Sequence, residues 1–275
     1  MLEYLYLLTA GLVGGLLAGF LGIGGGIAFI TILPIAITAT TQIPSEEMVP
    51  FVIANSLFAT VFASISGCLA LIRRSSFYYH EVAYVALGAI SSGLIVNELV
   101  HLGHWYSKEK FSIVIIAFLS YLVYTVIKNR NSEGENSAVV EHYKLKLFGG
   151  GVASGVISAL SGLGGGTVLV PILGKYCQMK VHKSKSISLG MIFCFSFTVS
   201  IINFMSTVDL NIGMYHIGYI LPEIVVPMGL GALIGSPLGV KFSHNAKPVV
   251  INIVFSLFIL FLIVKYLIYI FECFF

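Results

Sequence analysis

The sequence predicts an all-α integral membrane protein made of two homologous repeats, each with four hydrophobic segments. Its composition is the first indication, since 57% of the 275 residues are hydrophobic and only 10% are charged. Soluble domains carry roughly 25% charged residues, so lipid must cover most of this surface. The second indication is a set of long charge-free stretches, and the third is a glycine motif, GxGGG, that occurs twice.

Six charge-free stretches have the length of one bilayer crossing. A hydrocarbon core about 30 Å thick needs about 20 helical residues. The six predicted spanning segments are 48–72, 82–97, 111–127, 186–208, 224–240 and 248–264. Two further stretches, 4–45 and 147–174, are too long, because as helices they would extend roughly 63 and 42 Å.

A glycine cluster interrupts each of the two long stretches. The first cluster is Gly22, Gly24, Gly25 and Gly26, and the second is Gly162, Gly164, Gly165 and Gly166. Each glycine costs about 1 kcal/mol relative to alanine inside a helix, and backbone groups freed within lipid must find other partners. We therefore expect each long stretch to be two half-helices joined at the GxGGG turn. The pattern leaves open whether each pair crosses twice or forms a re-entrant hairpin.

An internal duplication relates the two halves of the chain. An offset of 140 aligns residues 11–34 with 151–174, including every glycine of the two turns. Further along, residues 54–57 fall beside 186–189, and Gly88-Ala89 pairs with Gly231-Ala232. This predicts a first membrane repeat over 1–128, a polar linker over 129–145 and a second membrane repeat over 146–275.

Basic residues in the predicted loops test how the broken segments run. If each long stretch crosses once, these residues divide six against eight between the two sides, which is no bias. If each stretch returns to its starting side, they divide twelve against two, with only Lys108 and Lys110 on the outer face. The positive-inside rule favours the second arrangement. It predicts that both termini lie outside and that the two repeats are inverted, as in many secondary transporters.

The glycine turns are the first candidate site. A helix that starts after such a turn has free N–H groups and a positive dipole end, both of which favour an anion. Glycine also lets a ligand approach the backbone. Close helix packing is the alternative explanation, and we assign it to the small-residue spacing of Gly11, Gly15 and Gly19. Three consecutive glycines in both halves exceed what packing requires, so we predict that the eight turn glycines bind substrate.

Polar side chains in mid-membrane complete the predicted site. Asn55 and Ser56 in the second segment, and Ser188 in the sixth, could donate hydrogen bonds to an oxyanion, or they could simply join helices. Two carboxylates are candidates for proton coupling, because ionisable groups in a membrane are expensive and are often functional. They are Glu223, between two prolines, and Glu81, which opens the third segment; an interfacial position remains the alternative for both.

The same residues resemble the TauE/SafE family of sulfite and organosulfonate exporters. The resemblance rests on Gly22–Pro34, Asn55–Leu57 and Gly88–Gly93, and on their counterparts in the second half. It implies a bacterial or archaeal inner-membrane carrier for sulfite, sulfoacetate or related small anions. The two halves differ from each other at two places of this pattern. Pro34 lies three positions after the residue that aligns with Pro171, and Asn55 aligns with Ile187.

Together these patterns predict a secondary transporter that exports a small anion across the cytoplasmic membrane, with proton coupling as one option. An anion channel or a non-transporting scaffold of the same fold is the alternative. We expect no metal and no other cofactor, and no enzymatic activity. The expected partners are the anion, membrane lipid and, as one option, a second copy in a homodimer; nucleic acid is not expected.

Overall fold

The computed structural model describes residues 2–44, 47–101, 143–208 and 212–246, with scattered positions between 110 and 120 and between 249 and 264. The predicted segments 111–127 and 248–264 therefore lie largely outside the described residues. In the described part, the regular elements are α-helices: α1 (Leu2–Leu21), α2 (Gly26–Thr40), α3 (Met48–Arg73), α4 (Tyr79–His101), α6 (Tyr143–Ser161), α7 (Gly166–Tyr176), α8 (Val181–Met205) and α9 (Pro222–Asn245).

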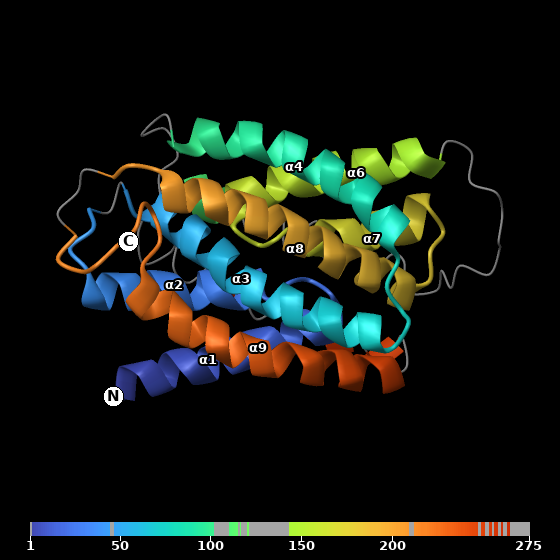
Figure 1. The fold of residues 1–275 in the computed structure, drawn as a ribbon, viewed down its shortest axis with the longest axis horizontal. Helices are drawn as coiled ribbons and strands as arrows, with labels where there is room; N and C mark the ends of the chain where they lie inside the picture. Colours follow the sequence, from blue (N-terminus) through green and yellow to red (C-terminus); the bar gives the residue numbers. More distant parts are fainter. Residues whose placement is uncertain are drawn as a thin grey trace.

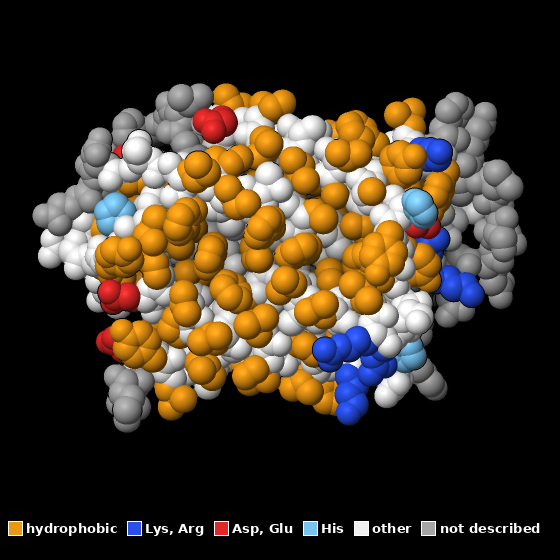
Figure 2. Space-filling view, in the orientation of Figure 1, with side chains coloured by type: hydrophobic (Ala, Val, Ile, Leu, Met, Phe, Trp, Pro, Cys, Tyr) orange, Lys and Arg blue, Asp and Glu red, His pale blue; other side chains and the backbone are white. Residues whose placement is uncertain are grey.

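Five of these helices, α1, α3, α4, α8 and α9, are long and apolar enough to span a membrane, and α2 is a shorter apolar helix. Hydrophobic side chains cover the middle of the molecule, and charged side chains gather at its two ends (Figure 2). The prediction of an all-α, multi-pass membrane protein is thereby confirmed.

Glycine geometry explains why α1 and α6 stop where they do. Gly22, Gly24 and Gly25 have φ angles of 73°, 79° and 75°, in the left-handed region that only glycine enters without cost. The turn after α6 repeats this geometry at the corresponding glycines. After each turn the chain runs back, so α1 and α2 have their outer ends at one end of the molecule and α6 and α7 at the other (Figure 1).

Backbone contact between glycines holds α1 against α9. A Cβ atom on Gly15 would lie 2.5 Å from the carbonyl oxygen of Ala232, and one on Gly235 would lie 2.1 Å from that of Leu12. Contacts between α4 and α6 have the same character, since a Cβ on Gly151 would lie 2.1 Å from Val85 O. Both pairs run parallel, and their glycines leave no space for side chains, as small-residue packing in membranes requires.

The packing divides the eight named helices of the described residues into two bodies of four helices each, and these bodies are not the two halves of the sequence. Helix α9 packs on α1 and α3, whereas α4 packs on α6 and α8. Body A, defined here as α1, α2, α3 and α9, therefore takes its last helix from the second half. Body B, defined as α4, α6, α7 and α8, takes α4 from the first half. The antiparallel helices α3 and α8 form the main contact between the bodies.

Charge is divided between the two ends of the molecule. Eight of the described basic residues gather at one end of the molecule, where α3, α7 and α9 finish and where α4, α6 and α8 begin; we call it the basic end (Figures 1 and 2). They are Arg73, Arg74, Lys144, Lys146, Lys175, Lys180, Lys183 and Lys241. Glu3, Glu98 and Glu223 lie at or near helix termini of the opposite end.

Gly235→Ala should destabilise the α1–α9 contact, because its methyl group would overlap Leu12 O. Overpacking of this kind costs about 1–3 kcal/mol, so the melting temperature in detergent should fall. Gly149→Ala in α6 is the matched control, since nothing lies within 4 Å of its Cβ position. There we expect no loss and a gain of up to about 1 kcal/mol from helix propensity.

Candidate functional site

The two glycine turns touch each other at the boundary between the bodies. A Cβ atom on Gly26 would lie 2.6 Å from the carbonyl carbon of Leu163, and one on Gly166 would lie 2.8 Å from Gly22 O. The contact is therefore backbone against backbone. This contact explains why the final residue of each motif is glycine. Its φ angle is helical, so the residue is required for the close approach and not for a left-handed conformation.

Ser56 and Ser188 bind the turn of the opposite body. Ser56 Oγ on α3 donates a hydrogen bond of 2.8 Å to Gly162 O, and Ser188 Oγ on α8 donates one of 2.8 Å to Gly22 O. Both serines are fully buried. Their hydroxyl hydrogens are engaged by carbonyl groups, so in this arrangement they position the turns rather than offer donors to a ligand.

Asn55 is also engaged, although differently. Its side-chain Nδ2 donates to Phe51 O at 2.8 Å and to Tyr219 O at 2.9 Å, and its Oδ1 accepts from Leu221 N at 2.8 Å. Because Tyr219 and Leu221 directly precede α9, Asn55 fastens the start of that helix to α3. The structure thus places Asn55 beside the turn-binding Ser56 but gives it a joining role within body A.

Helices α2 and α7 begin at the contact between the turns without a side-chain cap. Gly25 O accepts hydrogen bonds from Ala28 N and Phe29 N, and Gly165 O accepts those of Val168 and Leu169. Helix geometry leaves the first amides, those of Gly26 and Ile27 in α2, without an intrahelical acceptor. Two positive helix ends thus meet at one place, an arrangement that favours an anion.

Two residues whose buried hydroxyl groups lack a hydrogen-bond partner lie beside this point. Thr60 on α3 lies against both turns, since its Cγ2 is 3.1 Å from a Cβ position on Gly24 and 3.3 Å from one on Gly164. Thr60 Oγ1 and Thr167 Oγ1, the latter in the first turn of α7, are buried and lack a partner. A buried hydroxyl left unpaired costs about 1–3 kcal/mol, so these atoms indicate a place for a polar ligand.

Neither threonine was predicted from the sequence, although a signal existed. Thr60 lies four residues after Ser56 and therefore one helical turn further along the same face. Thr167 follows the second motif directly. Lys185 was misassigned, because it was counted among the loop charges. It is 6% exposed within α8, and its Cβ lies 2.7 Å from a Cβ position on Gly22.

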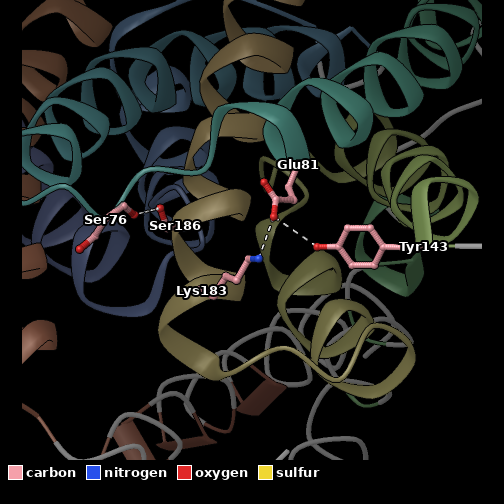
Figure 3. A network of polar contacts seen from close by, with 5 residues as sticks. All are labelled: Ser76, Glu81, Tyr143, Lys183 and Ser186. Atoms are coloured by element: carbon pink, nitrogen blue, oxygen red, sulfur yellow. Dashed lines mark hydrogen bonds and ion pairs between the residues drawn. The ribbon is translucent and has the colours of Figure 1, made fainter. Parts of the chain in front are cut away.

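The two predicted proton-coupling carboxylates lie far from the turns. Glu81, in the first turn of α4, forms an ion pair with Lys183 of α8 (2.7 Å) and accepts a hydrogen bond from Tyr143 of α6 (3.3 Å; Figure 3). This group joins three helices of body B at the basic end. Glu223 lies in the first turn of α9, at the opposite end, and its side chain is exposed.

Comparisons with known proteins agree on one family. The sulfite exporter TauE/SafE family matches residues 7–266. The chain is 27% identical over 256 residues to a protein of Methanocaldococcus jannaschii named a probable membrane transporter protein, covering 91% of this chain and 90% of that one. Another with the same description, from Bacillus subtilis, is 22% identical over 262 residues, covering 90% of each chain. No solved structure matches the chain.

Thr60→Val tests whether the unpartnered hydroxyl serves a ligand. Valine keeps the shape of threonine and removes a group that has no partner in the protein, so the melting temperature should stay the same or rise. Affinity for a transported anion, measured by isothermal titration, should fall about three- to tenfold, the effect of one hydrogen bond. Thr198→Val is the control, because that hydroxyl bonds to Cys194 O of its own helix. Equal affinity in wild type and Thr60→Val would remove Thr60 from the site.

Proposed function

The chain belongs to the sulfite exporter TauE/SafE family, a family of membrane transporters, and from this premise we propose that it is a secondary transporter for a small oxyanion such as sulfite or a sulfonate. We propose export across the cytoplasmic membrane of a bacterium or archaeon. The names of the family and of the relatives describe transporters rather than enzymes.

The contact between the two glycine turns is the observation that carries the proposal. It brings together two uncapped helix starts and two buried, unpartnered threonine hydroxyls, at a point with no described acidic side chain. Neutral N–H and O–H donors replace the hydration shell of an oxyanion without the cost of burying a full counter-charge. In our proposal the turn glycines and Thr60 bind the anion, Ser56 and Ser188 hold the turns in position, and Asn55 fastens α9 to α3.

An inverted repeat accounts for how the anion could be released on either side. The corresponding helix pairs α1/α2 and α6/α7 enter from opposite ends of the molecule (Figure 1). The main packing contacts of one body have counterparts in the other, such as α1 on α9 and α6 on α4, although α1 also packs on α3 and α6 makes no comparable contact with α8. In such transporters the site stays at the repeat interface while one part rocks against the other. We propose that bodies A and B are those two parts.

Orientation follows from the charge at the two ends. The positive-inside rule places the basic end in the cytoplasm, so the proposed topology has the start of α1 outside, and the predicted position of the carboxyl terminus is likewise outside. Exposed apolar side chains on α1, α4, α8 and α9 face lipid in this proposal or, in part, a second copy of the chain in a homodimer.

Flux measurements with protein in liposomes test the proposal. A carrier shows saturable sulfite flux that unlabelled anion on the opposite side accelerates. Conductance without saturation would identify a channel, and no flux with any of sulfite, thiosulfate, sulfonates or carboxylates would identify a scaffold.

The double variant Gly25→Leu and Gly165→Leu should abolish anion binding. Both positions have left-handed φ angles, 75° and 73°, and Cβ atoms there would lie 2.7 Å from Gly14 O and Ser154 O, so the turns must shift. Binding is measured by the sulfite-dependent rise in melting temperature, because a ligand stabilises the folded state by mass action. Gly174→Leu is the control, with nothing within 4 Å of its Cβ position. A folded double variant that binds normally would falsify the proposed clamp.

Glu223→Gln tests proton coupling. If Glu223 carries the coupling proton, the variant should lose flux driven by a pH gradient while keeping anion exchange, which needs no net proton movement. Since the side chain is exposed, the free energy of unfolding should change by less than about 0.5 kcal/mol, and the melting temperature should stay nearly the same.

Glu81→Gln provides the contrast. It breaks the ion pair with Lys183, so it should lower the melting temperature, and flux driven by a pH gradient should persist. Loss of gradient-driven flux in Glu81→Gln alone would move the coupling role to Glu81.

A further inference from the structure

Lys185 is a buried cation in a membrane-spanning helix. Its side chain crosses from α8 of body B to two groups of body A. Lys185 Nζ donates a hydrogen bond of 2.7 Å to Phe20 O, at the end of α1, and another to Ser243 Oγ on α9. The ammonium group also lies 5.7 Å from the centre of the Phe20 ring.

The charge of Lys185 is not neutralised within the described part of the chain. Its acceptors are a carbonyl and a hydroxyl, and no described carboxylate forms an ion pair with it. Glu81, the acidic residue of the basic end, is already paired with Lys183. Burial of a charge without a partner of opposite sign is costly, and such residues in membranes are usually functional.

The corresponding position in the other body carries no charge. Ser56 on α3 and Ser188 on α8 occupy equivalent positions, because each binds the first glycine of the opposite turn. Three residues before Ser56 the chain has Ile53, and three residues before Ser188 it has Lys185. Both contact a glycine of the opposite turn, Ile53 at Gly162 and Lys185 at Gly22. An isoleucine therefore satisfies the packing at this position, and the lysine adds a charge that the fold does not need.

Lys185 is one of several buried polar residues on α8 and α9 between the glycine turns and the basic end. Ser188, one helical turn further along α8, binds Gly22 O, so Lys185 and Ser188 hold the same turn. On α9, Ser236 and Ser243 share a face, and Ser236 Oγ is buried, unpartnered and directed at Gly67 of α3. At the same level, α3, α8 and α9 pack through the buried apolar side chains of Cys68, Leu189 and Val240, so Ser236 is a polar group within a closed contact.

We propose that Lys185 is the charge-recognition residue of the transporter and the first anion subsite on the basic side. The anion draws the ammonium group away from Phe20 O and Ser243, pairs with it, and passes to the neutral donors of the two turns. Because Lys185 connects the two bodies, anion binding also releases a contact that holds them together. This inference rests on the proposed anion transport and names the residue that selects for negative charge.

Sulfite flux into liposomes tests the proposal with three substitutions. Lys185→Met and Lys185→Gln should raise the KM for sulfite about tenfold or more, the loss expected for a hydrogen bond to a charged group. Glutamine can still donate to Phe20 O, so that variant keeps a structural bond without the charge. Lys185→Arg should keep a KM closer to that of the wild type. Removal of an unpaired buried charge should leave the melting temperature equal or higher.

Lys241→Gln is the matched control, since it removes one exposed charge from the same end of the molecule. Its KM should stay within about twofold, because exposed charges are screened. A purely structural Lys185 would instead lower the melting temperature in Lys185→Met and in Ser243→Ala, less so in Lys185→Gln, while KM stays unchanged, and that result would overturn the inference. Absence of saturable sulfite flux in the wild type would overturn the proposed function itself.

Discussion

The structure depends on the direct backbone contact of two glycine turns. Six glycines of these turns adopt left-handed φ angles, and the final glycine of each motif touches the opposite turn within 3 Å of a Cβ position. Any other residue at the final position would push the turns apart, and with them α3 and α8, whose serines bind the turns' carbonyl groups. Glycine at this one place therefore fixes the contact between bodies A and B and creates two adjacent helix starts within the membrane.

Two kinds of contact follow from that arrangement, and they differ in strength and in number. Within each body, long glycine stripes bring whole helices into backbone contact, as on α1 and α9. Between the bodies, the described polar contacts are a few individual hydrogen bonds, including those of Ser56, Ser188 and Lys185. Packing along an entire helix resists shear far more than isolated hydrogen bonds worth about 0.6 kcal/mol each in membrane proteins. The α1–α9 and α4–α6 contacts are also more extensive than the α3–α8 contact between the bodies, which passes the candidate site.

Sequence patterns predicted the membrane class, most of the described spanning segments and the place of the turns, because these depend on length, hydropathy and backbone freedom, which are local properties. The role of Ser56 and Ser188 was only half predicted, since nothing local shows that each binds the other body's turn. Lys185 was misassigned because three lysines between positions 180 and 185 look like a loop. Helix α8 begins at Val181 and carries the last of them into the interior, a result of tertiary packing that hydropathy does not encode.

Exchange of α4 and α9 between the bodies shows why the duplication alone does not define bodies A and B. A repeat seen in sequence suggests that each half is a unit, yet α9 packs on α1 and α4 packs on α6. The site lies where the bodies meet, between α3 and α8 and between the turns, and the asymmetry of Ile53 and Lys185 lies at the same boundary. The packing of the two bodies is nearly symmetric, whereas Lys185 is an unsymmetrical charge at their boundary, and in our proposal that charge selects the anion.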